Sequence, residues 1–198
     1  HRGDALFSTL EEWDAMLAQS GAVVLRKRAQ YLAQLEEKAE EIHDALSGGR
    51  EKLKLRYAGC DADEEGLVRL LRAAREEDCR RGFTSVGPHR DDYKIIINGK
   101  DARAFASQGQ QRTAALSLKL AEIEVMREET NEAPVLLLDD VMSELDVSRR
   151  RMLLTRIGGV QTMITCTHLD DLGGAEYEKA ISICEGKLNE SVDKILRK

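Results

Sequence analysis

The chain has 198 residues, of which 42% are hydrophobic and 33% charged, and its formal net charge is −6. This composition excludes a disordered chain, and no apolar run approaches the length of a membrane span. The acidic balance argues against a protein that coats nucleic acid through its overall charge, although a local basic patch remains compatible with it.

The chain starts at His1-Arg2-Gly3-Asp4, with neither an initiator methionine nor a signal pattern, so we expect a fragment of a longer protein. The sequence contains 4 cysteines, without C-x-x-C pairing or histidines at zinc spacing. Reduced thiols in a cytoplasmic protein are the simplest interpretation.

Residues 10–46 carry leucine, alanine and isoleucine at intervals of three and four, which predicts helix. Because Gly21 interrupts this pattern, we predict a shorter helix up to about Gln19 and a longer one after it, together an arm of antiparallel helices. The pair Gly48-Gly49 predicts the end of the second helix.

Residues 51–57 alternate charged and apolar side chains, as an edge strand does, and residues 61–81 return to a helical pattern. Residues 93–97 predict a strand that enters a tight hairpin turn at Asn98-Gly99. We place a domain boundary near Gly82, with a helical arm subdomain over residues 1–82 and a second domain over residues 83–198.

The last part of the chain alternates helix and strand, which is the signature of an α/β fold. We predict helices over 107–129 and 147–157 and strands over 135–138, 160–165 and 180–184. The four large apolar residues of 135–138 predict a strand buried on both faces, as in a parallel sheet covered by helices.

The run Ser107-Gln108-Gly109-Gln110-Gln111-Arg112 stands at the predicted start of a helix. A hydroxyl, a glycine and amide side chains at a helix N-terminus can present donors to phosphate oxygens. An N-cap role for Ser107 is compatible with this one. The sequence contains no G-x-x-x-x-G-K-[ST] loop, so it predicts half of an ATP site.

The predicted strand over 135–138 ends in Asp139 and Asp140, at the edge where open α/β sheets place their ligands. Such acids can equally cap the next helix. The order of the elements favours a ligand site over simple helix capping. Asp146 follows a few residues later, and the next predicted strand ends in Thr165-Cys166-Thr167-His168.

The run from Ser107 resembles the signature motif of ABC-type ATPases, residues 136–140 resemble their Walker B strand, and residues 143–146 their D-loop. The string Gly87-Pro88-His89-Arg90-Asp91-Asp92 and residues 137–153 are similar to the RecF family of DNA recombination and repair ATPases. The helical arm resembles the RecF arm subdomain, lobe II. The resemblance covers essentially the whole chain and implies the C-terminal half of an ABC-type ATPase head, a sheet covered by helices, with a helical arm subdomain.

The resemblance implies roles for individual residues. Asp139 would hold Mg²⁺, and Asp140 would orient or deprotonate the water that attacks ATP. Ser107, Gln108, Gly109 and Gln110 would bind the nucleotide, and Asp146 would lie at the dimer interface. For the γ-phosphate switch, Thr167 and His168 both remain candidates.

The resemblance further implies a DNA-dependent ATPase that dimerises with ATP, hydrolyses it slowly and binds DNA near single-strand gaps. RecO and RecR would be its partners, in DNA replication, DNA repair and the SOS response to DNA damage. We expect this chain alone to be inactive. The basic clusters that could contact DNA are Arg26-Lys27-Arg28, Arg69 with Arg72 and Arg75, Arg80-Arg81, and Arg149-Arg150-Arg151. Each could also be a solvated helix face balanced by acids, so DNA-contacting residues are not assigned.

Three alternatives stay open. Asp139, Asp140, Asp146, His168, Asp170 and Asp171 could form the metal cluster of a nuclease that needs no ATP. The chain could also be a non-catalytic module that binds DNA or protein. A transporter subunit would share the ATPase motifs, but the helical arm and the Gly87 to Asp92 string disfavour it.

Overall fold

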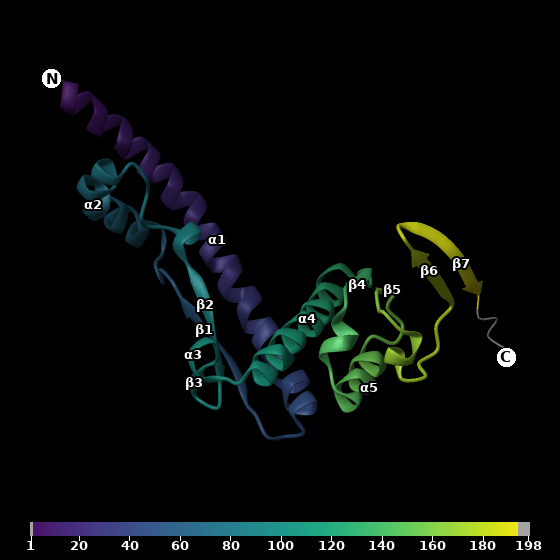
Figure 1. Ribbon diagram of the computed structural model, residues 1–198. Coiled ribbons are helices and arrows are strands. Elements are labelled where there is room, and N and C mark those ends of the chain that lie inside the picture. The colour runs from purple at the N-terminus through teal and green to yellow at the C-terminus, as the bar shows by residue number, and fades with distance from the viewer. Residues whose placement is uncertain (1, 194–198) are drawn as a thin grey trace. The chain divides into compact units, whose positions relative to one another are not determined.

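The computed structural model describes residues 2–193. The chain forms two compact units, residues 1–132 and residues 133–198 (Figure 1). The boundary predicted near Gly82 separates subdomains of the RecF-like architecture, which need not coincide with compact units of the chain. That boundary therefore stays a prediction. No helix of the described residues is long and apolar enough to cross a membrane.

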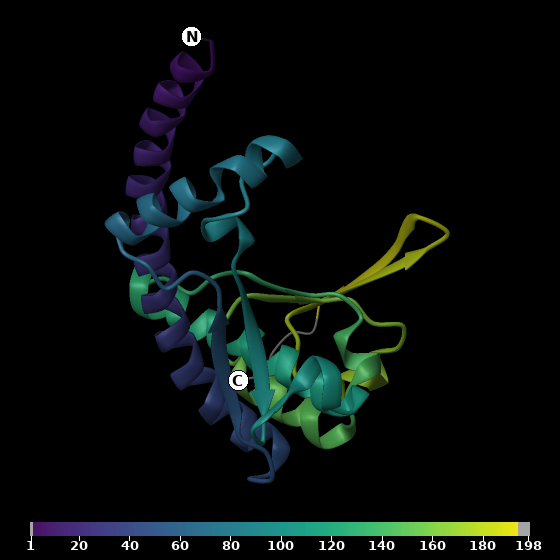
Figure 2. The same cartoon turned by 90° about the vertical axis from the view of Figure 1, so that its left-hand side faces the viewer.

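The first unit begins with one long helix, α1 (Arg2–Ser47), so the predicted break at Gly21 is wrong. A Cβ on Gly21 would lie 3.2 Å from Leu67 and 3.4 Å from Pro88, so this glycine lets other elements approach the helix closely. Packing of α2 (Glu64–Arg81) against α1 outweighs the roughly 1 kcal/mol that glycine costs a helix. The arm is therefore α1 with α2 beside it (Figure 2).

The helix boundaries otherwise follow their capping signals. Gly48 and Gly49 follow α1 with φ values of 67° and 74°, where glycine is favoured, and the predicted stop is confirmed. Asp63 caps α2 by accepting a hydrogen bond from the Gly66 amide, and Gly82 ends α2 in the left-handed conformation.

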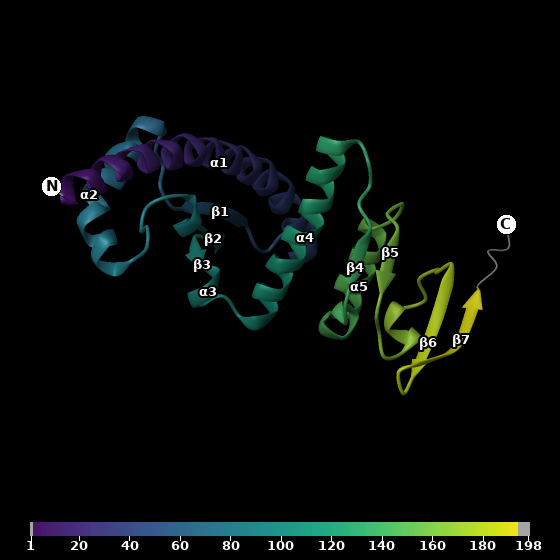
Figure 3. The ribbon, with the colours of Figure 1, turned by 90° about the horizontal axis from the view of Figure 1, so that it is seen from above.

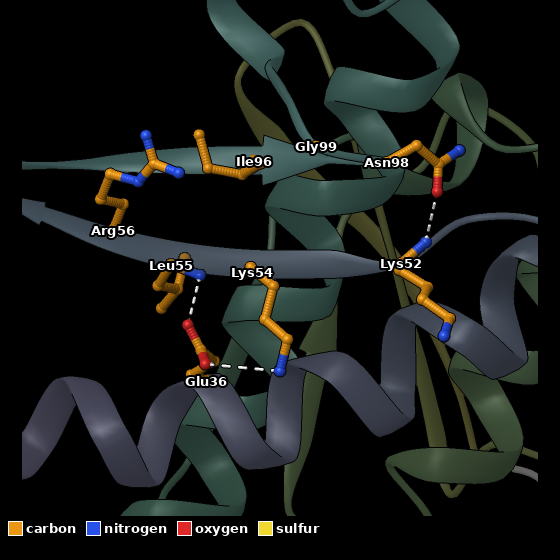
Figure 4. A pocket seen from close by; sticks show the side chains of 8 residues that line it. All are labelled: Glu36, Lys52, Lys54, Leu55, Arg56, Ile96, Asn98 and Gly99. Atoms are coloured by element: carbon orange, nitrogen blue, oxygen red, sulfur yellow. Dashed lines mark hydrogen bonds and ion pairs between the residues drawn. The ribbon is translucent and has the colours of Figure 1, made fainter.

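A three-stranded antiparallel sheet lies beside α1. It consists of β1 (Leu53–Ala58), β2 (Asp92–Ile97) and β3 (Lys100–Asp101) in that order. The predicted hairpin is confirmed, since Asn98 and Gly99 both have positive φ, at 49° and 80°. Glu36 of α1 reaches the sheet and accepts a hydrogen bond from the Leu55 amide at 2.6 Å, in the pocket of Figure 4. This contact occupies part of an otherwise open strand edge.

The short helix α3 (Ala102–Phe105) leads into α4 (Gln108–Thr130), which packs against α1 (Figure 3). The predicted helix over 107–129 is confirmed, and much of α4 from Thr113 to Val125 is buried. The buried apolar residues of these two helices include Leu35, Ala39, Ile42 and Leu46 of α1 and Leu116, Leu120, Ile123 and Val125 of α4. This packing sets the position of the α4 N-terminus.

The Gly87 to Asp92 string has a structural role in this unit. It contains the one-turn helix η1 (Pro88–Arg90) followed by Asp91, whose side chain is 4% exposed. Asp91 accepts hydrogen bonds from the Tyr57 hydroxyl and, at 3.0 Å, from the Cys60 amide. Burial and this carboxylate raise the pKa of Tyr57. A Cβ on Gly59 would lie 2.3 Å from Asp91, so the glycine is required for this contact.

Two further residues of the string, His89 and Arg90, contact the segment that follows α2. His89 Nε2 lies 2.9 Å from the Thr84 carbonyl oxygen, and Arg90 Nε donates to the same oxygen at 3.2 Å. The Arg90 guanidinium also lies 4.6 Å from the centre of the Phe83 ring. Both side chains are therefore held against residues 83–84.

The second unit contains a parallel pair, β4 (Leu136–Leu138) with β5 (Thr162–Ile164), and the helix α5 (Val147–Arg156) between them in sequence. The one-turn helices η2 (Val141–Glu144) and η3 (Leu169–Leu172) follow the two strands. A separate antiparallel hairpin joins β6 (Lys179–Cys184) to β7 (Lys187–Asp193), a strand that the sequence did not predict.

The prediction that residues 135–138 form a strand buried on both faces is wrong for the described structure. Leu138 is 7% exposed, whereas Leu137 is 70% exposed. Met163 of β5 and Ile183 of β6 are also exposed. The reason is that, among the described residues, β4 pairs with β5 alone. In both strands the middle residue is exposed while its two neighbours are more buried, so one face of the pair is open.

Candidate functional site

The N-terminus of α4 has the geometry of a capping box. Ser107 Oγ accepts a hydrogen bond from the Gln110 amide at 3.3 Å, and Gln110 Oε1 accepts one from the Ser107 amide at 2.8 Å. The first bond of the helical ladder runs from the Gln111 amide to the Ser107 carbonyl at 2.9 Å. The amides of Gln108 and Gly109 therefore precede the ladder and are available to a ligand.

This helix start suits an anion. Ser107, Gln108 and Gly109 are exposed, and no acidic residue stands in the first turn. A Cβ on Gly109 would meet nothing within 4 Å, so the space beside it is open. The structure thus brings three of the four predicted signature residues to one exposed turn.

Gln110 faces the protein instead. Its Nε2 donates to Glu51 Oε1 at 3.0 Å while its Oε1 is held by Ser107. These two bonds use one lone pair of the Gln110 side-chain oxygen and one of its two N–H donors. A nucleotide contact by this side chain would have to use the second N–H or the second lone pair. Glu51 is a residue that the sequence did not single out.

The second unit places Asp139 and Asp140 directly after β4, as predicted. Because Leu138 pairs with Ile164, Thr165 lies beside Asp139. Thr165 Oγ1 donates to Asp139 Oδ1 at 2.6 Å and accepts a hydrogen bond from the Asp140 amide at 2.9 Å. Both strand ends are therefore joined through one hydroxyl.

Asp140 has the left-handed conformation, with φ of 51°, and its side chain does not cap η2. A non-glycine residue in this region is uncommon and marks a position worth functional attention. Ser143 Oγ donates to its carbonyl oxygen at 2.9 Å. The main chain of Asp140 is thus fixed while its exposed carboxylate is not engaged in capping.

The donors around Asp139 fit a magnesium ion. One carboxylate oxygen is held by Thr165, and the other is left for a ligand on an exposed edge. Mg²⁺ in nucleotide sites takes one or two carboxylates and completes its shell with water and phosphate oxygens.

Asp146 caps α5. It accepts hydrogen bonds from the Arg149 amide at 2.9 Å and from Arg149 Nη1 at 2.8 Å. The hydrogen bond from the Arg149 main-chain amide is the main reason that the pKa of Asp146 lies below its usual value. The carboxylate is thus already occupied within its own chain.

Thr167 and His168 lie on the exposed segment between β5 and η3. In the described range, no hydrogen bond joins either side chain to Asp139 or Asp140, and Thr165 makes those contacts instead. From the sequence, no role was assigned to Thr165. Asp139 and Thr165 each directly follow a predicted apolar strand segment, and this shared position could have predicted that they meet.

The acids proposed for a nuclease do not form a metal cluster. Among residues 2–193, no group of three or more His, Cys, Asp or Glu side chains could hold a metal ion. Asp171 instead lies 3.3 Å from Arg150 Nη1, in an ion pair. The nuclease alternative therefore has no geometric support in the described residues.

Most arginines of the four basic clusters pair with acids. Arg75 Nη2 lies 2.5 Å from Asp14 Oδ2, for example, and Arg80 and Arg81 both pair with Glu77. Other pairs are Arg28 with Asp91, Arg69 with Glu65, Arg72 with Glu11, Arg149 with Asp146, and Arg150 with Asp171. These pairs favour balanced helix faces over a dedicated DNA surface.

Comparison with known proteins gives strong likenesses over nearly the whole chain. The DNA replication and repair protein RecF of Clostridium perfringens strain 13 is 40% identical over 185 residues, which are 90% of this chain and 51% of that protein. RecF of Agathobacter rectalis is 44% identical over 185 residues, 92% of this chain and 51% of that protein. The chain spans about half the length of the curated relatives it matches. No protein-family model matches it.

Solved structures agree with these likenesses. A structure of the recombination mediator protein RecF with ATP, in the RecFOR pathway, matches with a TM-score of 0.80 at 40% identity and covers 92% of this chain and 50% of that chain. An Smc head bound to the C-terminal winged-helix domain of ScpA matches with a TM-score of 0.54 at 16% identity, covers 90% of this chain and 49% of that chain, and shows the fold alone. The predicted α/β fold of an ATPase head is confirmed.

Proposed function

Because this chain belongs to the RecF family of DNA replication and repair proteins, we propose that it works within a full-length ATP-gated protein that binds DNA during recombinational repair. ATP would hold two copies of the full-length protein together, and slow hydrolysis would release them. By resemblance, the full-length protein would act in the cytoplasm at single-strand gaps with RecO and RecR.

The observation that carries the proposal is the joined end of β4 and β5. Asp139, Asp140 and Thr165 meet at the carboxyl edge of two parallel strands, where α/β folds bind their ligands. The likeness of this chain to a solved RecF structure with ATP supports a nucleotide as the ligand.

At this edge each residue has a proposed task. Asp139 would hold Mg²⁺, which supplies positive charge to the phosphates. Asp140 would accept the proton of the attacking water, and its fixed main chain favours a constant position. Most ABC ATPases carry a glutamate here, so the shorter aspartate supports slow hydrolysis.

The exposed start of α4 would bind the γ-phosphate of an ATP molecule held by the other copy. Ser107 would donate through its hydroxyl, and Gln108 and Gly109 through their amides. Asp146 would lie at the same interface, and Thr167 or His168 would contact the γ-phosphate. Each ATP site would therefore need residues from two chains.

DNA binding should depend on both ATP and salt. We expect the full-length protein to bind a gapped duplex at least about tenfold more weakly at 200 mM than at 50 mM salt, because phosphate contacts release counterions. ATP should strengthen binding, measured by fluorescence anisotropy. An affinity for the gapped duplex that is the same with and without ATP and at both salt concentrations would contradict the proposal. Cleavage of the DNA with Mg²⁺ and without ATP would support the nuclease alternative.

A further inference from the structure

A chain of polar side chains is buried between α1 and α4. In the described part of the chain, the buried polar or charged residues are His43, Ser47, Thr113 and Ser117. His43 is fully buried, with Nδ1 3.1 Å from Ser117 Oγ and Nε2 3.1 Å from Glu51 Oε2. Burial of an unpaired polar group lowers the stability of a protein. The hydrogen bonds within this cluster offset that loss in an otherwise apolar interface.

The bond directions within the cluster follow from the number of protons available. The Ser117 hydroxyl donates its one proton to the Thr113 carbonyl at 2.8 Å, so its oxygen accepts from His43 Nδ1. His43 Nε2 has Glu51 Oε2 as its partner, so both ring nitrogens of the buried His43 are paired.

Glu51 connects this buried cluster to the candidate nucleotide site, because it contacts both His43 and Gln110. Its amide donates to Ser47 Oγ at 3.3 Å, and its side chain is 16% exposed. Its second carboxylate oxygen accepts from Gln110 Nε2 at 3.0 Å. Gln110 is therefore held at both ends of its amide, by Glu51 on one side and by the Ser107 main chain on the other.

We propose that His43 and Glu51 are positioning residues for ATP: they fix Gln110, and through it the exposed Ser107 to Gly109 turn, in the form that receives the γ-phosphate. The inference rests on the proposed function of this turn. It also makes the end of α1 and the nucleotide-binding start of α4 one connected piece. Neither His43 nor Glu51 touches the nucleotide.

The test replaces Glu51 in the full-length protein. With Glu51→Ala, Gln110 Nε2 loses its acceptor, and we expect the ATP concentration for half-maximal hydrolysis to rise about tenfold, as loss of a hydrogen bond to a charged group predicts. The maximal rate should stay within about twofold, because Asp140 is untouched. Glu51→Gln keeps an oxygen that can accept from Gln110 and should restore most of the ATP affinity.

Glu36→Ala is the matched control. Glu36 is also a partly buried carboxylate that accepts a main-chain hydrogen bond across elements, from Leu55 at 2.6 Å, and it pairs with Lys54 at 3.5 Å (Figure 4). Within residues 2–193, Glu36 makes no hydrogen bond or ion pair with the α4 N-terminus. Its loss should therefore lower the unfolding temperature without changing the ATP concentration for half-maximal hydrolysis. Equal ATP dependence in Glu51→Ala and Glu36→Ala would overturn the positioning role.

Two outcomes separate this inference from the function beneath it. If the wild-type protein hydrolyses ATP and Glu51→Ala does so with unchanged affinity, the positioning role alone fails. If the wild-type protein neither binds nor hydrolyses ATP, both fail. Should Glu51→Ala not fold, Glu51→Gln decides through hydrogen exchange of the Ser107 amide: protection equal to wild type supports the role, and lost protection without a change in ATP affinity overturns it.

Discussion

Replacing Asp140 with asparagine in the full-length protein is expected to slow ATP hydrolysis by about a hundredfold or more, the usual worth of a general base. Asparagine has nearly the same shape, so the left-handed main chain and its hydrogen bonds to Thr165 and Ser143 should persist. The amide cannot accept the proton of the attacking water. ATP binding should remain, and the measurement is phosphate release at saturating ATP.

Asp170→Asn serves as the matched control for this variant. Asp170 is an exposed acid in η3 of the same unit, and the change in charge and shape is identical. We expect its rate to match wild type. An Asp140→Asn protein that hydrolyses ATP as fast as the Asp170→Asn protein would remove Asp140 from the proposed role.

A second large effect is expected at the start of α4. Ser107→Arg should abolish ATP-dependent dimerisation of the full-length protein, because a long side chain would fill the open space beside Gly109 through which phosphate must approach. Loss of the cap itself would cost only about 1 kcal/mol of stability. Light scattering with ATP and Mg²⁺ measures the effect as a mass that stays monomeric.

Two further variants separate this role from general damage. Ser20→Arg makes the same substitution at an exposed position of α1 and should dimerise normally. Ser107→Thr keeps a capping hydroxyl and should retain dimerisation. If Ser107→Arg dimerises with ATP as Ser20→Arg does, the turn does not bind the shared phosphate.

Local signals predicted several parts of the structure. The N-cap role of Ser107 could be predicted from its place at the start of a helix, and the hairpin from the turn that Asn98-Gly99 specifies. The position of Asp139 and Asp140 followed from the apolar strand before them. In each case the deciding interaction spans only a few residues.

Long-range contacts decided what the sequence did not predict. Gly21 continues α1 because Leu67 and Pro88 pack close to it, and Gln110 turns inward because Glu51 lies beside it. The apolar run that includes Leu137 predicts burial, but burial depends on which strands and helices adjoin it. None of these neighbours is near in sequence, so no local pattern reports them.

The most direct test of a shared ATP site mixes two inactive variants. Ser107→Arg and Asp140→Asn full-length proteins are combined in equal amounts, and ATP hydrolysis is measured. If each site joins Ser107 of one copy to Asp140 of the other, every mixed dimer holds one intact site. Random pairing would make about half of the dimers mixed, so activity should rise above that of either variant alone, to at most about a quarter of the wild-type rate. A mixture as inactive as either variant alone would contradict the shared site.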